Sequence, residues 1–233
     1  MTIEICIPAF NEESVIAAAA KTVLQVFREA GKEAIVTVSD NGSTDDTAAT
    51  ASALEGVRVI SVQVRGKGAA IIAAARDSRA SIFGYIDADL SAHPSDILSM
   101  LPLIESGQAD LVIGSRLVVP RSVKRAALRT LSSKVFNALR KTILGIRVED
   151  TQCGLKLMNE KGRAVLAACT EVGWFFDMEF LARAERQGLV ILEVPVHWDE
   201  YRFPERRSRL NLLGDGLKAI QAMYRIRNKI ASQ

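Results

Sequence analysis

Short apolar segments alternate with helical segments throughout the first half of the chain, and this alternation restricts the possible folds most strongly. The apolar segments are too short for helices and are bounded by turn residues, which is typical of buried strands. Strands alternating with helices predict an α/β fold with a parallel sheet covered by helices on both faces. The predicted strands are residues 3–7, 34–39, 57–62, 81–86 and 111–113, and the predicted helices are residues 13–29, 44–54 and 66–78, followed by one that starts at His93 and Pro94.

Beyond residue 116 the pattern is less regular, and the absence of a linker predicts one domain over residues 1–233 with a helical C-terminal elaboration. The last helix carries an apolar stripe (Leu213, Leu217, Ile220 and Tyr224) that either packs in the core or makes a second surface contact. The predicted elements are a basic amphipathic helix at 121–144, strands at 154–158 and 189–194, and helices at 177–187 and 210–230.

The composition is that of a globular protein, with 48% hydrophobic and 24% charged residues among 233. The longest run without a charged residue has eight residues, so no membrane-spanning helix is expected, and the strand-like start predicts no signal peptide. Three cysteines without CxxC spacing favour a reducing compartment, so we expect a cytoplasmic protein. Two histidines exclude a histidine-rich metal site and disfavour a Ser-His-Asp hydrolase.

Positive charge is concentrated in two zones. Residues 111–148 hold nine basic and no acidic residues, and residues 200–233 hold eight basic and three acidic ones, whereas residues 1–110 are acidic overall. We therefore expect an anionic partner, such as a membrane surface or a phosphorylated lipid. Nucleic acid is not expected, because no recognition motif is visible. The basic helix suits peripheral binding at the cytoplasmic face of a membrane, directly or through a membrane-embedded partner, although a packed helix with a solvated basic face has the same pattern.

Polar or glycine-rich clusters follow all five predicted strands of the first half. Ligands bind beyond the carboxyl ends of the strands in open parallel sheets, so the clusters predict one binding edge. The paired carboxylates of Asp87 and Asp89 suit a hard cation such as Mg²⁺, and the alternative is a solvated turn. The turn Gly66-Lys67-Gly68 either admits an anion close to the backbone or is a tight turn with a surface lysine. It is not a GxxxxGK[ST] phosphate loop.

These motifs together resemble family-2 glycosyltransferases of the GT-A fold. Within that family they are similar to the polyprenyl-phosphate sugar transferases related to dolichyl-phosphate glucosyltransferase and mannosyltransferase. The resemblance implies a Rossmann-like, mostly parallel sheet covered by helices. The motifs that carry it are Pro8 to Glu12, Asp40 to Asp45, Gly66 to Gly68, Asp87 to Asp89, Gly114 to Arg116, Asp150 to Lys156 and Trp174 to Glu179.

The resemblance implies transfer of a hexose from UDP-glucose or GDP-mannose to a polyprenyl (dolichyl-type) phosphate, with inversion at the sugar. Residues 1–116 would bind the nucleotide sugar, and residues 117–233 would face the acceptor and membrane. Asp87 and Asp89 would hold Mg²⁺ or Mn²⁺, and Arg116 would face the active centre as a catalytic residue together with Asp89. The implied donor-binding residues are Pro8, Ala9, Asn11, Glu12, Asp40, Asn41, Lys67, Asp87, Ala88, Arg207 and Arg209, and the implied acceptor-phosphate residues are Arg129 and Ser133.

The chain departs from the family pattern at three positions. Asn41 replaces an aspartate, Ser91 replaces a glutamine of the mannosyltransferase-like members, and Val64 replaces an asparagine. The first departure bears on which base is bound and the second on a third metal contact.

Several alternatives stay open. A family-2 enzyme with a hydroxyl acceptor would need a base such as Asp177, which is otherwise a helix-capping aspartate. A non-catalytic nucleotide-sugar-binding protein would not need Asp87 and Asp89. A nucleotidyltransferase would carry a glycine-rich loop after the first strand, which this chain lacks. Trp174 and Trp198 either stack on a sugar or fill the core, and we expect the core for both.

Overall fold

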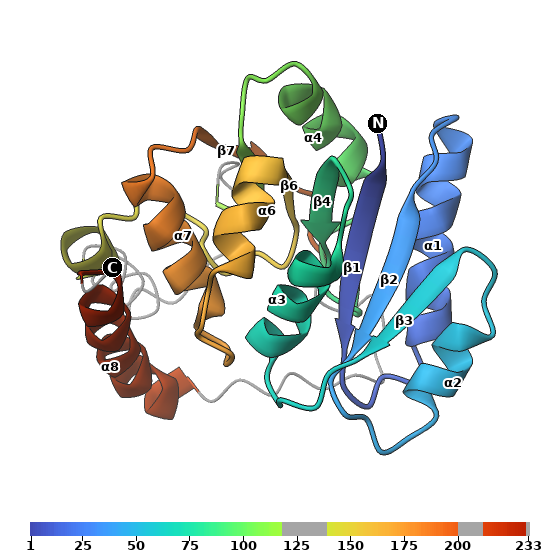
Figure 1. Ribbon diagram of the computed structural model, residues 1–233, viewed down its shortest axis with the longest axis horizontal. Coiled ribbons are helices and arrows are strands. Elements are labelled where there is room, and N and C mark those ends of the chain that lie inside the picture. Colours follow the sequence, from blue (N-terminus) through green and yellow to red (C-terminus); the bar gives the residue numbers. More distant parts are fainter. Residues whose placement is uncertain (118–138, 200–211, 232–233) are drawn as a thin grey trace.

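The computed structural model describes residues 1–117, 139–199 and 212–231. Within these residues, seven strands form one sheet in the order β3-β2-β1-β4-β6-β5-β7 (Figure 1). The strands are β1 (Ile3–Ala9), β2 (Ile35–Asp40), β3 (Val57–Ser61), β4 (Ile82–Tyr85), β5 (Leu111–Ser115), β6 (Lys156–Asn159) and β7 (Ile191–Pro195). The helices are α1 (Ile16–Glu29), α2 (Thr47–Ser52), α3 (Lys67–Asp77), α4 (Asp96–Glu105), α6 (Glu160–Ala167), α7 (Phe176–Arg186) and α8 (Leu212–Ala231), with a further helical segment at 139–144.

The sheet is mostly parallel, as predicted, but β6 runs antiparallel to both of its neighbours, β4 and β5. The remaining strand pairs are parallel. The prediction of a parallel sheet is therefore confirmed for β1 to β4 and for β5 with β7. It is wrong for β6, which lies between β4 and β5. Because β6 runs backwards, its first residue, Lys156, pairs with Tyr85 at the last position of β4. The chain that precedes β6 thus reaches the carboxyl edge of the sheet.

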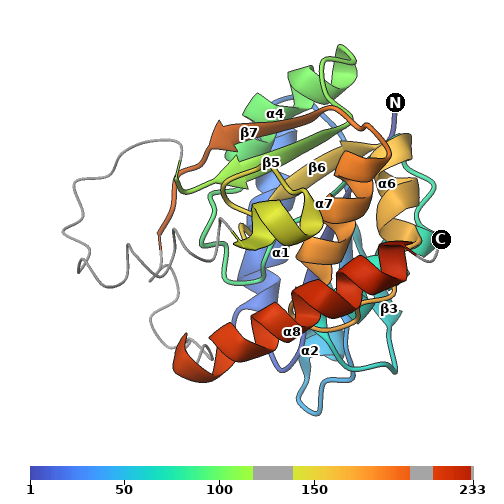
Figure 2. The same cartoon turned by 90° about the vertical axis from the view of Figure 1, so that its left-hand side faces the viewer.

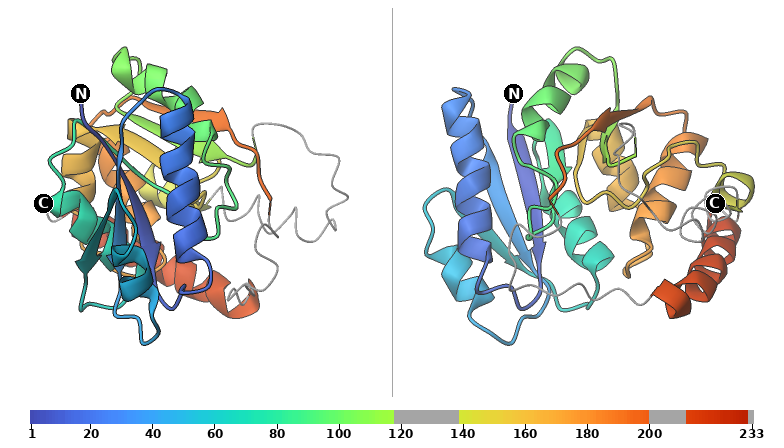
Figure 3. Two further views of the ribbon diagram at one scale, coloured as in Figure 1. Left: turned by 90° about the vertical axis from the view of Figure 1, so that its right-hand side faces the viewer. Right: turned by 180° about the vertical axis from the view of Figure 1, so that it is seen from behind.

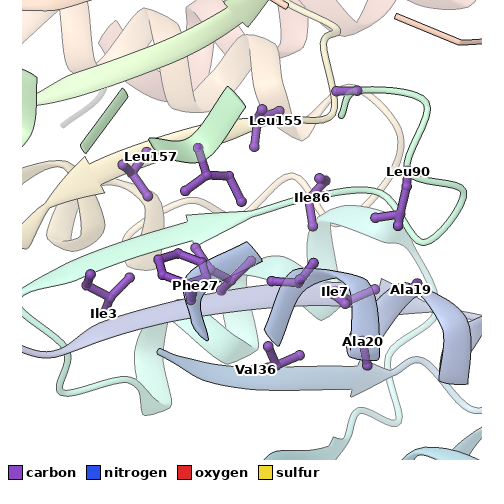
Figure 4. Packing of buried hydrophobic residues seen from close by; sticks show 14 of the residues in the cluster. Ile3, Ile7, Ala19, Ala20, Phe27, Val36, Ile86, Leu90, Leu155 and Leu157 are labelled. Carbon is purple, nitrogen blue, oxygen red and sulfur yellow. The ribbon is translucent and has the colours of Figure 1, made fainter. Parts of the chain in front are cut away.

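Helices cover both faces of the sheet, because successive strand side chains point to opposite sides. Ile5 and Ile7 of β1 belong to the buried cluster that includes residues of α1, α2 and α4, whereas Cys6 belongs to the cluster on the other face that includes residues of α3, α6, α7 and α8. Figure 1 shows α3, α6 and α7 in front of the sheet, and the right panel of Figure 3 shows α1 and α4 on the reverse side. Figure 4 shows Phe27 and Ala20 of α1 against the strands, and both are buried.

Helix α6 is absent from the sequence prediction. The side chain of Asn159 caps its start by accepting the amides of Lys161 (3.0 Å) and Gly162 (3.1 Å). Asparagine is a favoured capping residue, and Glu160 behind it suits the positive end of the helix. This local signal was available in the sequence.

Helix α8 packs in the core through a different stripe from the predicted one. Tyr224 is half exposed and Ile220 is only partly buried, while Leu213 and Leu217 lie where no side chain is described. The buried residues of α8 are Ala219, Ala222, Met223, Ile226 and Ile230. None of the helices in the described ranges combines the length and apolar character needed to cross a membrane.

Candidate active site

The loops after β1 and β2 are joined by hydrogen bonds at the carboxyl edge of the sheet. The amide of Asn11 donates to Oγ of Ser43 (2.9 Å), and the amide of Thr44 donates to Oδ1 of Asn11 (2.9 Å). The amide of Glu12 donates to Oγ1 of Thr47 (2.8 Å). Asn11 has φ of +54°, a left-handed conformation that asparagine tolerates better than most residues. The motifs predicted from the first two strands therefore form one connected corner.

Asp40 ends β2 in this corner and Asn41 follows it, and both are buried. Oδ1 of Asp40 has no hydrogen-bond partner among the described residues. The Asn41 amide, in contrast, is engaged within its own chain: Nδ2 donates to the Val64 carbonyl (2.6 Å), and Oδ1 accepts the Gly66 amide (2.5 Å). Asn41 thus holds the loop after β3, while Asp40 keeps one oxygen that can accept a hydrogen bond from a ligand.

Asp87 and Asp89 lie in a tight turn directly after β4. The Leu90 amide donates to the Asp87 carbonyl (2.9 Å), and Leu90 has φ of +49°. A leucine rarely adopts this conformation, and its fully buried side chain packs in the core below. The amide of Ser91 donates to Oδ1 of Asp89 (3.0 Å), so Ser91 contacts the site through its backbone.

The carboxylate of Asp87 is held from two sides. Lys67 Nζ lies 2.6 Å from its Oδ1. Gly154 lies against its other oxygen so closely that a Cβ at Gly154 would come within 2.1 Å of Oδ2. Burial alone lowers the pKa of Lys67, but the nearby carboxylates of Asp87, Asp177 and Asp89 raise that pKa above its usual range. Lys67 is therefore a cation at neutral pH, placed beside the paired carboxylates.

From the sequence, the turn Gly66-Lys67-Gly68 could either admit an anion close to the backbone or be a tight turn. The structure does not leave space for an anion beside the two glycines. A Cβ at Gly66 would lie 2.1 Å from the Val172 carbonyl oxygen, and a Cβ at Gly68 would lie 2.6 Å from that of Glu171. The amide of Ala69 donates to the Val172 carbonyl (3.0 Å). Glycine is required here because another segment of the chain packs against the start of α3. Nor is Lys67 a surface lysine, because its side chain is only 14% exposed.

Arg116 is fixed by a bidentate ion pair with Asp150. Its Nε and Nη2 each donate to a different oxygen of Asp150, both at 2.7 Å, and its guanidinium lies 4.7 Å from the ring centroid of Trp198. Burial raises the pKa of the Asp150 carboxyl, but hydrogen bonds and charge from Arg116 outweigh it and lower the pKa below its usual range. Our sequence reasoning assigned no role to Asp150, although it opens one of the motifs that carry the resemblance.

Asp177 is buried and paired. Its Oδ1 accepts the Tyr85 hydroxyl (2.6 Å) and lies 2.7 Å from Nζ of the fully buried Lys156. The Lys156 ammonium also donates to the carbonyls of Thr151 (3.1 Å) and Cys153 (2.7 Å). Burial and the Asp177 charge raise the pKa of Tyr85, so its hydroxyl stays protonated. The helix-capping alternative for Asp177 is wrong, because the N-cap residue of α7 is Phe175 and the Asp177 carboxylate is paired with Tyr85 and Lys156 instead.

Lys156 and Tyr85 were missed from the sequence. The available signal was a lysine inside an otherwise apolar strand, since a buried ammonium needs an anionic partner.

The sequence decides which family the chain belongs to. The sequence model described as Glycosyl transferase family 2 matches residues 4–163, which is more than half of the chain. The chain belongs to glycosyl transferase family 2. It is therefore a glycosyltransferase, as its motifs predicted.

Curated relatives of this family-2 glycosyltransferase differ in length. Glycosyltransferase AglD of Haloferax volcanii is 28% identical over 223 residues, which cover 91% of this chain and 35% of that protein. Dolichyl-phosphate beta-glucosyltransferase of Saccharomyces cerevisiae is 29% identical over 251 residues, which cover 97% of this chain and 74% of that protein. The chain thus spans about a third of one relative and three quarters of the other.

A solved structure supports the GT-A fold. Glucosyl-3-phosphoglycerate synthase from Mycobacterium tuberculosis, in complex with Mn²⁺, UDP and glucosyl-3-phosphoglycerate, matches with a TM-score of 0.67 at 25% identity. The match covers 97% of this chain and 79% of that structure's chain. The predicted α/β GT-A fold is confirmed.

The residues at the end of β4 fit a divalent cation. Asp87 and Asp89 offer the hard oxygen ligands that Mg²⁺ and Mn²⁺ prefer, and the missing side chain of Gly154 leaves room for the Asp87 carboxylate. In the part of the chain that the structure describes, no three His, Cys, Asp or Glu residues form a metal-holding group. A cation here would take its remaining ligands from donor phosphates and water.

The two tryptophans do not both fill the core. Trp174 is 50% exposed, and its ring centroid lies 5.1 Å from Lys67 Nζ, so the core expectation is wrong for this residue. Trp198 packs partly buried against the core and carries Arg116 on its ring.

Four predicted site residues, Arg129, Ser133, Arg207 and Arg209, lie outside the described residues. Within the basic zone, Arg147 is exposed, whereas Arg140 is 2% exposed, with Nη2 3.4 Å from the Glu149 carbonyl. The charge pattern alone had predicted a solvated or membrane-facing basic surface for this zone. Arg140 does not belong to such a surface, because its side chain is buried.

Proposed function

We propose that this glycosyltransferase transfers a hexose from a nucleotide sugar, UDP-glucose or GDP-mannose, to a polyprenyl phosphate. The observation that carries the proposal is the pairing of Asp177 with Lys156 and Tyr85. A hydroxyl acceptor must lose a proton during attack, so it requires a base. A phosphate acceptor is already anionic near neutral pH and requires none. The similarity to dolichyl-phosphate beta-glucosyltransferase supports the same acceptor.

The donor binds at the corner built by the ends of β1, β2 and β4. Oδ1 of Asp40 accepts a hydrogen bond from the nucleobase, and Pro8, Ala9, Asn11 and Glu12 line the nucleoside site. Support comes from the buried oxygen of Asp40, which has no partner among the described residues, and from the hydrogen bonds that join these loops.

The diphosphate binds beside Asp87, Asp89 and Lys67. The two carboxylates would hold Mg²⁺ or Mn²⁺, which would supply positive charge as the leaving group becomes more negative. The Lys67 ammonium, placed 2.6 Å from Asp87, balances the remaining phosphate charge.

The acceptor approaches from the side of Arg116. An acceptor phosphate oxygen forms the bond to the anomeric carbon, while the nucleoside diphosphate leaves with the electrons of the broken bond. The attack is in line, so it inverts the anomeric centre. No proton moves in this step, which agrees with the engaged state of Asp177.

We place this reaction at the cytoplasmic face of a membrane, where a polyprenyl phosphate resides. The support is the basic zone at 111–148, in which Lys141 and Arg147 are exposed. Docking is direct or through a membrane-embedded partner.

The experiment mixes the protein with radiolabelled UDP-glucose or GDP-mannose, Mg²⁺ or Mn²⁺, and a polyprenyl phosphate in detergent. We expect label in the organic extract that depends on the lipid, and at least hundredfold less with Asp89→Ala. The control variant Glu33→Ala removes an exposed carboxylate from the loop before β2, at the opposite edge of the sheet, and should keep full activity. Donor hydrolysis without labelled lipid would contradict the lipid acceptor.

The second candidate is transfer to a small hydroxyl acceptor. The structural similarity to glucosyl-3-phosphoglycerate synthase favours it. Replacing the lipid by 3-phosphoglycerate in the same assay separates the two candidates, because labelled glycosyl-3-phosphoglycerate, resolved from free sugar and donor by anion exchange, would appear only for the second.

A further inference from the structure

The first turn of α3, which contains Lys67, is covered by residues 170–175, which we name the capping loop. The carbonyl of Val172 accepts the Ala69 amide, and the loop backbone fills the space beside Gly66 and Gly68. Trp174 at the end of the loop lies over the Lys67 ammonium. The position of this lysine therefore depends on the position of the capping loop.

Helix α7 holds the start of the capping loop from inside the protein. The fully buried Glu179 accepts the amides of Thr170 (2.9 Å) and Glu171 (2.5 Å), and Nε of Arg183 donates to it (2.9 Å). Burial raises the pKa of Glu179, but these hydrogen bonds outweigh burial and lower the pKa below its usual range. Glu179 is therefore ionised at neutral pH and fixes two consecutive amides.

Helix α8 holds the same loop from outside. Nη2 and Nε of Arg225 lie 2.6 and 3.1 Å from Oε2 of Glu171, and Lys229 Nζ donates to Oγ1 of Thr170 (3.1 Å). The Glu171 side chain is 11% exposed and that of Arg225 is 50% exposed. Figure 2 shows α8 running across α7, and the hydrogen bonds of Arg225 and Lys229 connect α8 to the loop. Two guanidinium nitrogens contact the carboxylate, and one partner of the pair is largely buried. Such an ion pair restrains its partners better than a fully exposed one.

We infer that Glu171 and Arg225 are positioning residues for Lys67. Their ion pair connects α8 to the capping loop and, through the loop, fixes the first turn of α3 for binding of the donor diphosphate. Lysine has a long flexible side chain, so a fixed backbone and a covering aromatic ring reduce the ordering that binding requires. This inference rests on the proposed function, in which Lys67 binds the donor.

The test titrates UDP and GDP, each with Mn²⁺, into the wild type, Arg225→Ala, Lys67→Met and the double variant by calorimetry. We expect Arg225→Ala to raise the Kd about fivefold, as for coupled neighbours. Lys67→Met should raise it at least as much, and the double variant should match Lys67→Met within about twofold. Additive effects of the two substitutions would overturn the inference.

The matched control is Arg227→Ala, which removes the same charge from an exposed position of the same helix. We expect its Kd to match the wild type, and equal weakening by both arginine variants would show a general effect of charge and overturn the inference. If Arg225→Ala does not fold, Glu171→Gln removes the same ion pair at constant size. Its Kd should exceed that of the wild type by the same factor of about five that is expected for Arg225→Ala. If the wild type binds neither nucleotide, the proposed function fails and this inference fails with it, whereas binding with additive effects defeats the inference alone.

Discussion

The two sides of the candidate active site are built differently. On the side that we propose binds the donor, formed by the loops after β1, β2 and β4, backbone amides and short polar side chains join the loops, and Oδ1 of Asp40 has no partner among the described residues. On the proposed acceptor side, formed by residues 150–156 and the start of α7, charged side chains neutralise one another. Lys156 and Asp177 are almost fully buried, whereas the donor-side pair of Lys67 and Asp87 is partly exposed.

The difference indicates how each side acts. Groups with unused hydrogen-bonding capacity can bind a ligand, whereas buried charges that satisfy each other hold the backbone in place. In the proposed reaction the donor side would therefore recognise its ligand through direct contacts. The buried ion pairs on the acceptor side would mainly hold the loops in place, with Asp150 fixing Arg116.

The largest expected effect comes from breaking the buried pair. Lys156→Met leaves the Asp177 carboxylate buried without its cation and should reduce the free energy of unfolding by about 3–5 kcal/mol. Urea denaturation measures this change. Adding Asp177→Asn to Lys156→Met should recover at least about 1 kcal/mol, because the uncompensated charge is gone. No recovery in the double variant would show that the pair is not electrostatically coupled.

A donor-side substitution should affect activity instead of stability. Asp89→Ala should reduce kcat/KM about 100- to 1,000-fold, equivalent to about 2.7–4 kcal/mol of transition-state stabilisation. Its free energy of unfolding should change by less than about 1 kcal/mol, since Asp89 is partly exposed. Steady-state kinetics and urea denaturation on the same preparation test both statements. A large loss of stability would remove the contrast between the two sides.

The contact between the capping loop and α3 is sensitive to volume. Gly68→Ala places a methyl group 2.6 Å from the Glu171 carbonyl oxygen and should reduce the free energy of unfolding by about 1–3 kcal/mol. Gly173→Ala in the same loop is the control, because its Cβ meets an atom of Glu171 only at 3.4 Å. Thermal unfolding distinguishes the two variants, and an equal effect would show that the loop tolerates the added group.

The smallest effect concerns pH. Arg116 lowers the pKa of Asp150 in the folded state below its unfolded value of about 3.9. The pair therefore contributes stability above the unfolded pKa and loses it as pH falls through the lower folded pKa. Between pH 5 and pH 2 the free energy of unfolding should fall less steeply in Asp150→Asn than in the wild type. Equal slopes in urea denaturation across this range would contradict the assignment.

Much of the fold was predictable from the sequence. All the predicted strands of residues 1–115 occur, because apolar segments and turn residues act over a few neighbouring positions. Predictions failed where the cause lies elsewhere in the chain. Nothing local to residues 156–159 shows that β6 inserts antiparallel between β4 and β5, and the buried face of α8 depends on what it packs against.

For the candidate site too, some features were predictable from the sequence and others depended on distant parts of the chain. Its donor-side residues follow strand ends, so the topology rule for parallel sheets was enough to bring Asp40, Asp87 and Asp89 to one edge. The sequence could not show that Gly66 and Gly68 make room for the capping loop, or that Trp174 is exposed, since both depend on segments about a hundred residues apart.

The sequence by itself determined the family, the alternation of elements and the edge at which the polar motifs gather. Local periodicity, turn residues and motif wording are all properties of neighbouring residues. Only the tertiary structure decided that Asp177 is the counterion of Lys156, that Arg116 is held by Asp150, and that α8 reaches Lys67 through the capping loop. Each of these pairings joins distant residues, and burial, which no local pattern reports, makes the charges depend on each other.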